Sequence, residues 1–202
     1  MGQKQRLAIL AAVLCLGLVG CATRPLVISP RLRPLDTSPA RPHDPLVLVS
    51  FQDAVPKDEV GRKRFREQPI DVFNDTLLVA LRTSQIFNRV VRGSEPPDMA
   101  YRLTGVIRSL KTNESAFKFG LVPSTMGITA ACVVSVRLVD LKTSAVLLDD
   151  TLTTSGKGQA RIHGGGQNVQ YDSTSGYEES LSQAISDAVS MIVKRVAEAM
   201  PR

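Results

Sequence analysis

The sequence predicts an α+β domain in which a largely antiparallel sheet carries two helices on one face. Four segments between residues 46 and 154 are short apolar runs or alternate apolar and polar residues, as strands do. Two other segments repeat apolar residues with the period of an amphipathic helix. Their order is β-α-β-β-β-α, and packing both helices on one sheet face would bury both apolar stripes.

The first strand and the first helix follow each other along the chain. "LVLVSF", Leu46 to Phe51, is a β-branched apolar run after a proline, which predicts a buried strand. Residues 71–85 predict a helix, with Asp71 as its N-cap. Its apolar positions recur every four residues at Phe73, Leu77 and Leu81.

The remaining three strands are predicted from alternation and from turn residues. "YRLTGVIR" alternates from Tyr101 to Arg108, and Gly105 within it indicates a bulge or a helix packed closely against it. A hairpin follows, with arms near 131–140 and 145–154 joined by the turn "DLKTS".

A long helix is predicted at the end of the chain, from "SGYEES" to "AEAM". Ser175 and Glu178 fit a capping box at its start. One apolar stripe runs along it through Leu181, Ile185, Ala188, Ile192 and Val196.

Two segments have no simple assignment. Residues 155–176 are polar, rich in glycine and longer than most connections, so they are functional or disordered, and we favour disorder. Residues 114–129 form an apolar insertion outside a clear element, which either covers the sheet or is an exposed contact site for a partner or lipid. The candidate contact residues are Phe117, Phe119, Leu121 and Val122.

The first twenty residues have the pattern of an export signal. Lys4 and Arg6 precede an apolar run, Leu7 to Val19, and small Gly20 follows. The run is shorter than the roughly 20 residues of a membrane-spanning helix.

The run "LVGC", which ends at Cys21, resembles the bacterial lipobox. The resemblance implies that the Cys21 thiol receives a diacylglycerol, that the signal is cut before Cys21, and that a fatty acid such as palmitate acylates the new amine. The thiolate is the nucleophile for this alkyl transfer. Ala22, where retained lipoproteins of enterobacteria have Asp, implies an outer-membrane, periplasm-facing location.

Residues 21–45 are predicted to be a lipidated, proline-rich tether. Six of the twelve prolines fall here, so we expect the segment to be extended and unpaired, holding the domain several nanometres from the membrane. Its arginines are interpreted as solvated charges, with lipid headgroups or peptidoglycan as alternative contacts. The expected organisation is a signal peptide at 1–20, the tether at 21–45, and one periplasmic domain at 46–202.

Net charge and cysteine content argue against nucleic-acid binding and against an intramolecular disulfide. The net charge of +6 becomes +4 when Lys4 and Arg6 leave with the signal, which is too mild to imply nucleic acid. After removal of Cys15 with the signal and lipidation of Cys21, Cys132 has no intramolecular disulfide partner, and we expect it to be a small buried residue.

The sequence of the mature chain lacks the common motifs of metal, hydrolase and nucleotide-binding sites. His43 and His163 do not have zinc-ligand spacing, and no G-x-S-x-G motif is present. Lys157 in "SGKG" is followed by Gly158, where a phosphate-binding Walker motif needs Ser or Thr. We therefore expect no enzyme activity, no cofactor and no metal.

Three stretches resemble bacterial envelope lipoproteins with a TolB-N-terminal-like α/β domain. They are the helix end with Ser84 and Phe87, the strand from Tyr101 to Ile107, and the strand end and turn at 140–144. Members include auxiliary lipoproteins of ABC transport systems, activators of penicillin-binding proteins and the curli-secretion lipoprotein. The lipopolysaccharide-assembly lipoprotein is of similar build. A curli-type pore is not expected, because no long amphipathic β-hairpin is evident.

The resemblance implies a non-enzymatic, lipid-anchored accessory subunit of an envelope transport or assembly machine. Its partners would be the membrane, through the anchor, and an envelope protein. The alternative is a carrier lipoprotein that binds lipid or glycolipid, and an envelope hydrolase is a third, weaker hypothesis.

The Cys21→Ser variant should lose acylation and accumulate as unprocessed precursor, because the hydroxyl is a far weaker nucleophile than the thiolate. Metabolic labelling with a fatty acid measures this directly. Label that persists on the variant would contradict the lipobox assignment.

Overall fold

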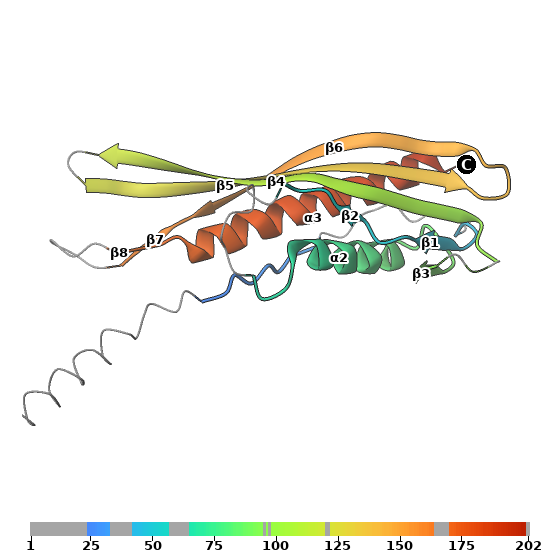
Figure 1. The fold of residues 1–202 in the computed structure, drawn as a ribbon, viewed down its shortest axis with the longest axis horizontal. Helices are drawn as coiled ribbons and strands as arrows, with labels where there is room; N and C mark the ends of the chain where they lie inside the picture. Colours follow the sequence, from blue (N-terminus) through green and yellow to red (C-terminus); the bar gives the residue numbers. More distant parts are fainter. Residues whose placement is uncertain are drawn as a thin grey trace, which may run out of the picture.

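The computed structural model has an α+β fold in which two helices lie together on one face of a sheet (Figure 1). The helices are α2 (Pro69–Thr83) and α3 (Thr174–Ala199). The predicted fold class is confirmed. The residues that the structure describes are 24–32, 42–56, 65–94, 96, 98–119, 122–163 and 170–200.

Six strands form the main sheet in the order β3-β1-β4-β5-β6, and β2 pairs separately with β4. The three long strands β4, β5 and β6 are antiparallel, whereas the short β1, β2 and β3 run parallel to their neighbours. Their bounds are β1 (Leu46–Leu48), β2 (Gln52–Asp53), β3 (Val90–Arg92), β4 (Tyr101–Phe119), β5 (Val122–Asp140) and β6 (Val146–Gln159).

The apolar insertion at 114–129 is part of a long β-hairpin, so the expectation that it lies outside a clear element is wrong. Apart from residues 120 and 121, which lie outside the described residues, it belongs to β4 and β5. The expectation that the chain has no long β-hairpin is corrected as well. Pro123 suggested a loop, but it pairs opposite Lys118 beside an irregularity in the register, where a strand tolerates proline.

The segment 155–176 is mostly ordered secondary structure, so the expected disorder is wrong for its described part. β6 continues to Gln159, β7 (Arg161–His163) and β8 (Gln170–Asp172) form a second small sheet, and α3 begins at Thr174. Residues 164–169 lie outside the described residues.

Three glycines explain why this segment has a loop-like composition. A Cβ atom on Gly156 would lie 2.0 Å from the Ser180 carbonyl oxygen, and one on Gly158 would lie 2.0 Å from the Gly176 carbonyl oxygen. α3 therefore contacts the backbone of β6 directly. The Thr154 hydroxyl reinforces this contact by donating to the Ala184 carbonyl at 2.8 Å.

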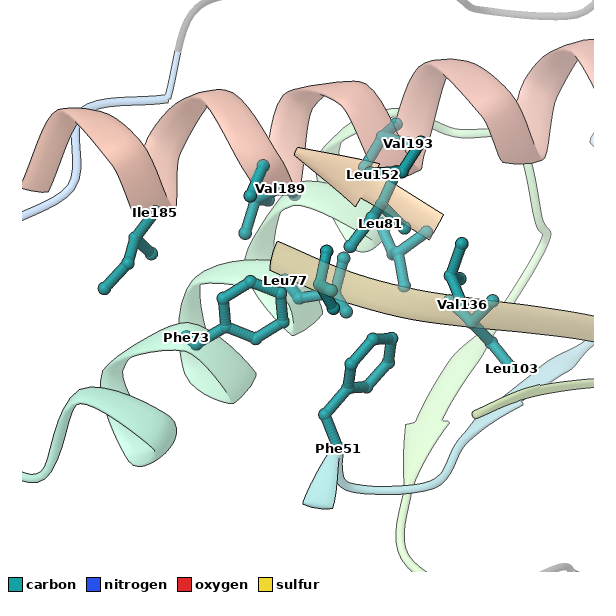
Figure 2. Packing of buried hydrophobic residues seen from close by; sticks show 14 of the residues in the cluster. Phe51, Phe73, Leu77, Leu81, Leu103, Val136, Leu152, Ile185, Val189 and Val193 are labelled. Atoms are coloured by element: carbon teal, nitrogen blue, oxygen red, sulfur yellow. The ribbon is translucent and has the colours of Figure 1, made fainter. Parts of the chain in front are cut away.

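The core lies between the helices and the sheet, where Phe51 meets Phe73 of α2 with ring centroids 5.4 Å apart (Figure 2). Both predicted apolar stripes are buried in it. A Cβ on Gly105 would lie 2.0 Å from the Phe51 ring, so this glycine admits an aromatic ring and not, as expected, a helix or a bulge. Phe87 is also buried and packs against Tyr101.

Cys132 is fully buried in β5, as expected for a small core residue. Burial raises the pKa of the Cys132 thiol to about 12. The thiol is therefore protonated and unreactive at neutral pH in the folded protein.

The helix starts differ from the predicted caps. The N-cap residues are Gln68 for α2 and Ser173 for α3, and neither makes a side-chain capping hydrogen bond. Asp71 lies in the first turn of α2 rather than at its N-cap. The capping box of Ser175 and Glu178 does not form, because the Glu178 carboxylate binds the N-terminal segment.

The Gly156→Ala variant should be destabilised, because a methyl group cannot fit against the Ser180 carbonyl unless α3 shifts. Overpacking of this kind costs about 2 kcal/mol, which corresponds to a fall in Tm of roughly 4–8 °C in a chain of this size. Thermal melting of the purified protein measures it. The matched control is Ser155→Ala, on the exposed face of the same strand. Equal Tm values for both variants would contradict the close contact.

Candidate functional site at the N-terminal segment

Residues 24–32, called here the anchor segment, pack along α3 immediately after the predicted lipidation site. Leu26 and Ile28 are buried, with exposed fractions of 6% and 8%. Leu26 clusters with Ile128 of β5 and Tyr177 of α3. Two residues of the anchor segment are therefore buried in the domain.

Polar contacts hold the same segment. Arg24 forms an ion pair with Glu178 at 3.0 Å, and the Val27 backbone N–H donates to the same carboxylate at 2.8 Å. Further along, the Ser29 N–H donates to the Ser182 hydroxyl at 2.9 Å. The expectation of an unpaired tether is wrong for this segment, because its backbone donors bind side chains of α3.

A second part of the expected tether is also fixed to the domain. The His43 N–H donates to the Ile86 carbonyl at 2.7 Å, and the Asn88 N–H donates to the His43 carbonyl at 2.8 Å. Residues 33–41, between the two fixed parts, lie outside the described residues.

A groove of about 1470 Å³ lies along the anchor segment and α3. Its lining combines apolar surface with side chains of both charges, and Arg24 pairs with Glu178 there. The charged lining residues are Arg24, Arg31, Arg66, Glu178, Glu179 and Asp187.

The predicted contact residues gather by backbone pairing at the end of the β4–β5 hairpin. Phe119 pairs with Val122, and Phe117 pairs with Thr125. Cys21 and Leu121 lie outside the described residues. β6 reaches only as far as the pair Gly127–Gln159. The described strand ends beyond it, 115–119 and 122–126, are called here the hairpin tip; they pair with each other and project past the sheet (Figure 1).

Sequence reasoning missed the anchor segment and its acceptor, Glu178. The available signal was "PLVISP", in which Leu26 and Ile28 alternate as in a buried strand. The prolines on both sides favoured an extended, unpaired tether instead.

Within the described residues, no group of three or more His, Cys, Asp or Glu side chains could hold a metal ion. No helix in that part of the chain has both the length and the apolar character to cross a membrane.

The fold resembles that of a Xanthomonas campestris protein of the DUF330 family. The TM-score is 0.58 at 14% identity, with 87% of this chain and 96% of that chain covered. At this identity the similarity shows a shared fold alone. No protein-family model and no curated protein sequence matches the chain.

Two more distant structures are also similar. A PelC dodecamer from Paraburkholderia phytofirmans has a TM-score of 0.41 at 15% identity, covering 79% of this chain and 93% of that one. A minor lipoprotein from Acinetobacter baumannii has a TM-score of 0.40 at 10% identity, covering 76% and 92%. Both scores lie below 0.5, so the shared fold rests on the Xanthomonas protein.

The Glu178→Ala variant should release the anchor segment, because it removes the partner of Arg24 and the acceptor of the Val27 N–H. Losing a hydrogen bond to a charged group costs about 1.5–3 kcal/mol, which predicts local opening about tenfold more frequent or higher. Limited trypsin digestion measures it at Arg31, because Arg24, Arg33 and Arg41 all precede proline, which blocks cleavage.

The matched control is Glu179→Ala, the neighbouring and more exposed carboxylate. The digestion rate after Arg31 should match that of the unaltered protein. Equal rates for the Glu178 and Glu179 variants would show that the carboxylate of Glu178 does not hold the segment.

Proposed function

We propose that the protein is a non-enzymatic, lipid-anchored accessory subunit of an envelope transport or assembly machine, positioned at the periplasmic side of the outer membrane. The observation that carries this proposal is the packed anchor segment. Arg24, three residues after Cys21, is already fixed to α3. An acyl chain on Cys21 would thus hold the folded domain at the membrane instead of on a long, loose linker.

The resemblance to TolB-N-terminal-like lipoproteins and the lipobox support the same proposal. In that group the domain serves larger envelope machines. The residues that carry the resemblance have structural roles here, as the burial of Phe87 against Tyr101 illustrates. The resemblance therefore supports a binding module and names no reacting group.

The outer face of the sheet is the surface best suited to a protein partner. Neither α2 nor α3 lies on it (Figure 1). A polar row crosses three strands there, in which the Ser135 hydroxyl bonds with Arg108 and, at 3.0 Å, with Thr151. Such a row supplies donors and acceptors of the kind that protein–protein interfaces use for their hydrogen bonds.

The carrier alternative has less support, because a lipid carrier needs an apolar wall for acyl chains. In the groove beside the anchor segment, six charged side chains interrupt the apolar lining.

A photo-crosslinking residue placed at Thr151 in intact cells should capture one envelope protein. The same residue at Lys194, exposed on α3, is the matched control and should not capture it. The Cys21→Ser background should lose the Thr151 adduct, because the domain is no longer positioned at the membrane. The unaltered protein should fractionate with the outer membrane.

The result that would overturn the proposal is the absence of a Thr151 adduct together with stoichiometric lipid in the purified protein. That combination, measured by native mass spectrometry, would favour the carrier. Recovery mainly with inner-membrane markers would contradict the outer-membrane location alone.

A further inference from the structure

The anchor segment and the hairpin tip begin at the same place in the fold. Leu26 clusters with Ile128, and Ile128 is the residue next to the pair Gly127–Gln159, where the hairpin leaves the main sheet. Figure 1 shows the hairpin tip and the N-terminal end of α3 at the same end of the molecule. The chain that leads back to Cys21 and the hairpin tip therefore start from the same part of the fold.

The chain from Leu26 to Cys21 and the strand from Ile128 to Val122 also have similar maximum lengths. Cys21 lies five positions before Leu26, so the two Cα atoms can lie at most about 18 Å apart. Val122 lies six positions before Ile128, and a strand of that length projects about 20 Å. A leaflet that holds the acyl chain on Cys21 is consequently within reach of the hairpin tip.

The composition of the tip suits a membrane interface. The strand ends 115–119 and 122–126 contain two phenylalanines, a valine, a methionine and one lysine, with no acidic residue. Aromatic and aliphatic side chains bury in the interfacial region, while lysine extends its ammonium group to the headgroups. The groups that would oppose contact with an anionic surface are thus missing from these positions.

The backbone limits how deep such a contact can be. Beyond Gly127, no described strand other than its hairpin partner pairs with either tip strand. Outward-facing backbone N–H and C=O groups need hydrogen bonds, which the hydrocarbon core does not provide. The hydrated headgroup region does provide them, so shallow insertion is compatible with two open edges.

We propose that the hairpin tip, through Phe117, Phe119 and Val122, inserts shallowly into the leaflet that holds the lipid anchor. This rests on the lipid anchor of the proposed function. The acyl chain and the tip then make two separate membrane contacts, which fix the orientation of the domain as well as its distance from the membrane.

The test uses the full acylated protein, purified from membranes and reconstituted in vesicles of phosphatidylethanolamine and phosphatidylglycerol. An environment-sensitive fluorophore is attached through Phe119→Cys. In the mature chain Cys21 carries the lipid and Cys132 is buried, so the new thiol is the reactive one. The matched control is Thr143→Cys, an exposed position in the β5–β6 turn at the opposite end of the molecule.

The Phe119 probe should shift to shorter wavelength, and brominated lipid should quench its emission, whereas the Thr143 probe should stay unquenched. A melting curve for each labelled protein verifies that it is folded. A Phe119 probe that remains in water on lipid-attached protein overturns the inference. If fatty-acid labelling shows no acylation, the proposed function and the inference both fail, so the two failures are distinguishable.

Discussion

The direct contact between α3 and the backbone of β6 is the constraint on which the rest of the structure depends. Gly156 and Gly158 have no side chain, so the α3 backbone can lie in the space that a Cβ atom would otherwise occupy. This close contact places Tyr177 beside Ile128 and Glu178 beside the anchor segment. The anchor segment can bind only because the helix already lies at this position.

A lipid anchor acts differently when the residues after it are fixed. A long flexible linker gives the attached domain a wide range of distances and orientations. Here the buried Leu26 and the ion pair of Arg24 with Glu178 leave two residues between Cys21 and the fixed chain. With the proposed lipid on Cys21, the fold would set the orientation of the domain at the membrane, as the proposed accessory subunit would need in order to meet its partner in one geometry.

The periodic elements could be predicted from the sequence, and the elements shaped by tertiary contacts could not. The stripes of α2 and α3 and the arms of the hairpin at 131–154 have clear periods, and each forms as expected. Gly156 and Pro123 usually indicate loops, yet each lies in a strand, because a helix approaches the first and an irregular pairing accommodates the second. Leu26 and Ile28 alternate over only three residues between prolines, and the residues that bury Leu26, Ile128 and Tyr177, lie far along the chain.

The two proposed contacts, insertion of the hairpin tip into the leaflet and docking of a protein on the outer sheet face, use different parts of the molecule. A tip in the leaflet would direct the long hairpin away from the membrane, with the β5–β6 turn farthest from it (Figure 1). The polar row of Arg108, Ser135 and Thr151 lies on the side of that hairpin, several strand residues from the tip. A partner could therefore dock laterally on the sheet while the tip and the acyl chain remain in lipid. The apolar and the polar surfaces would then act at the same time, because neither occludes the other.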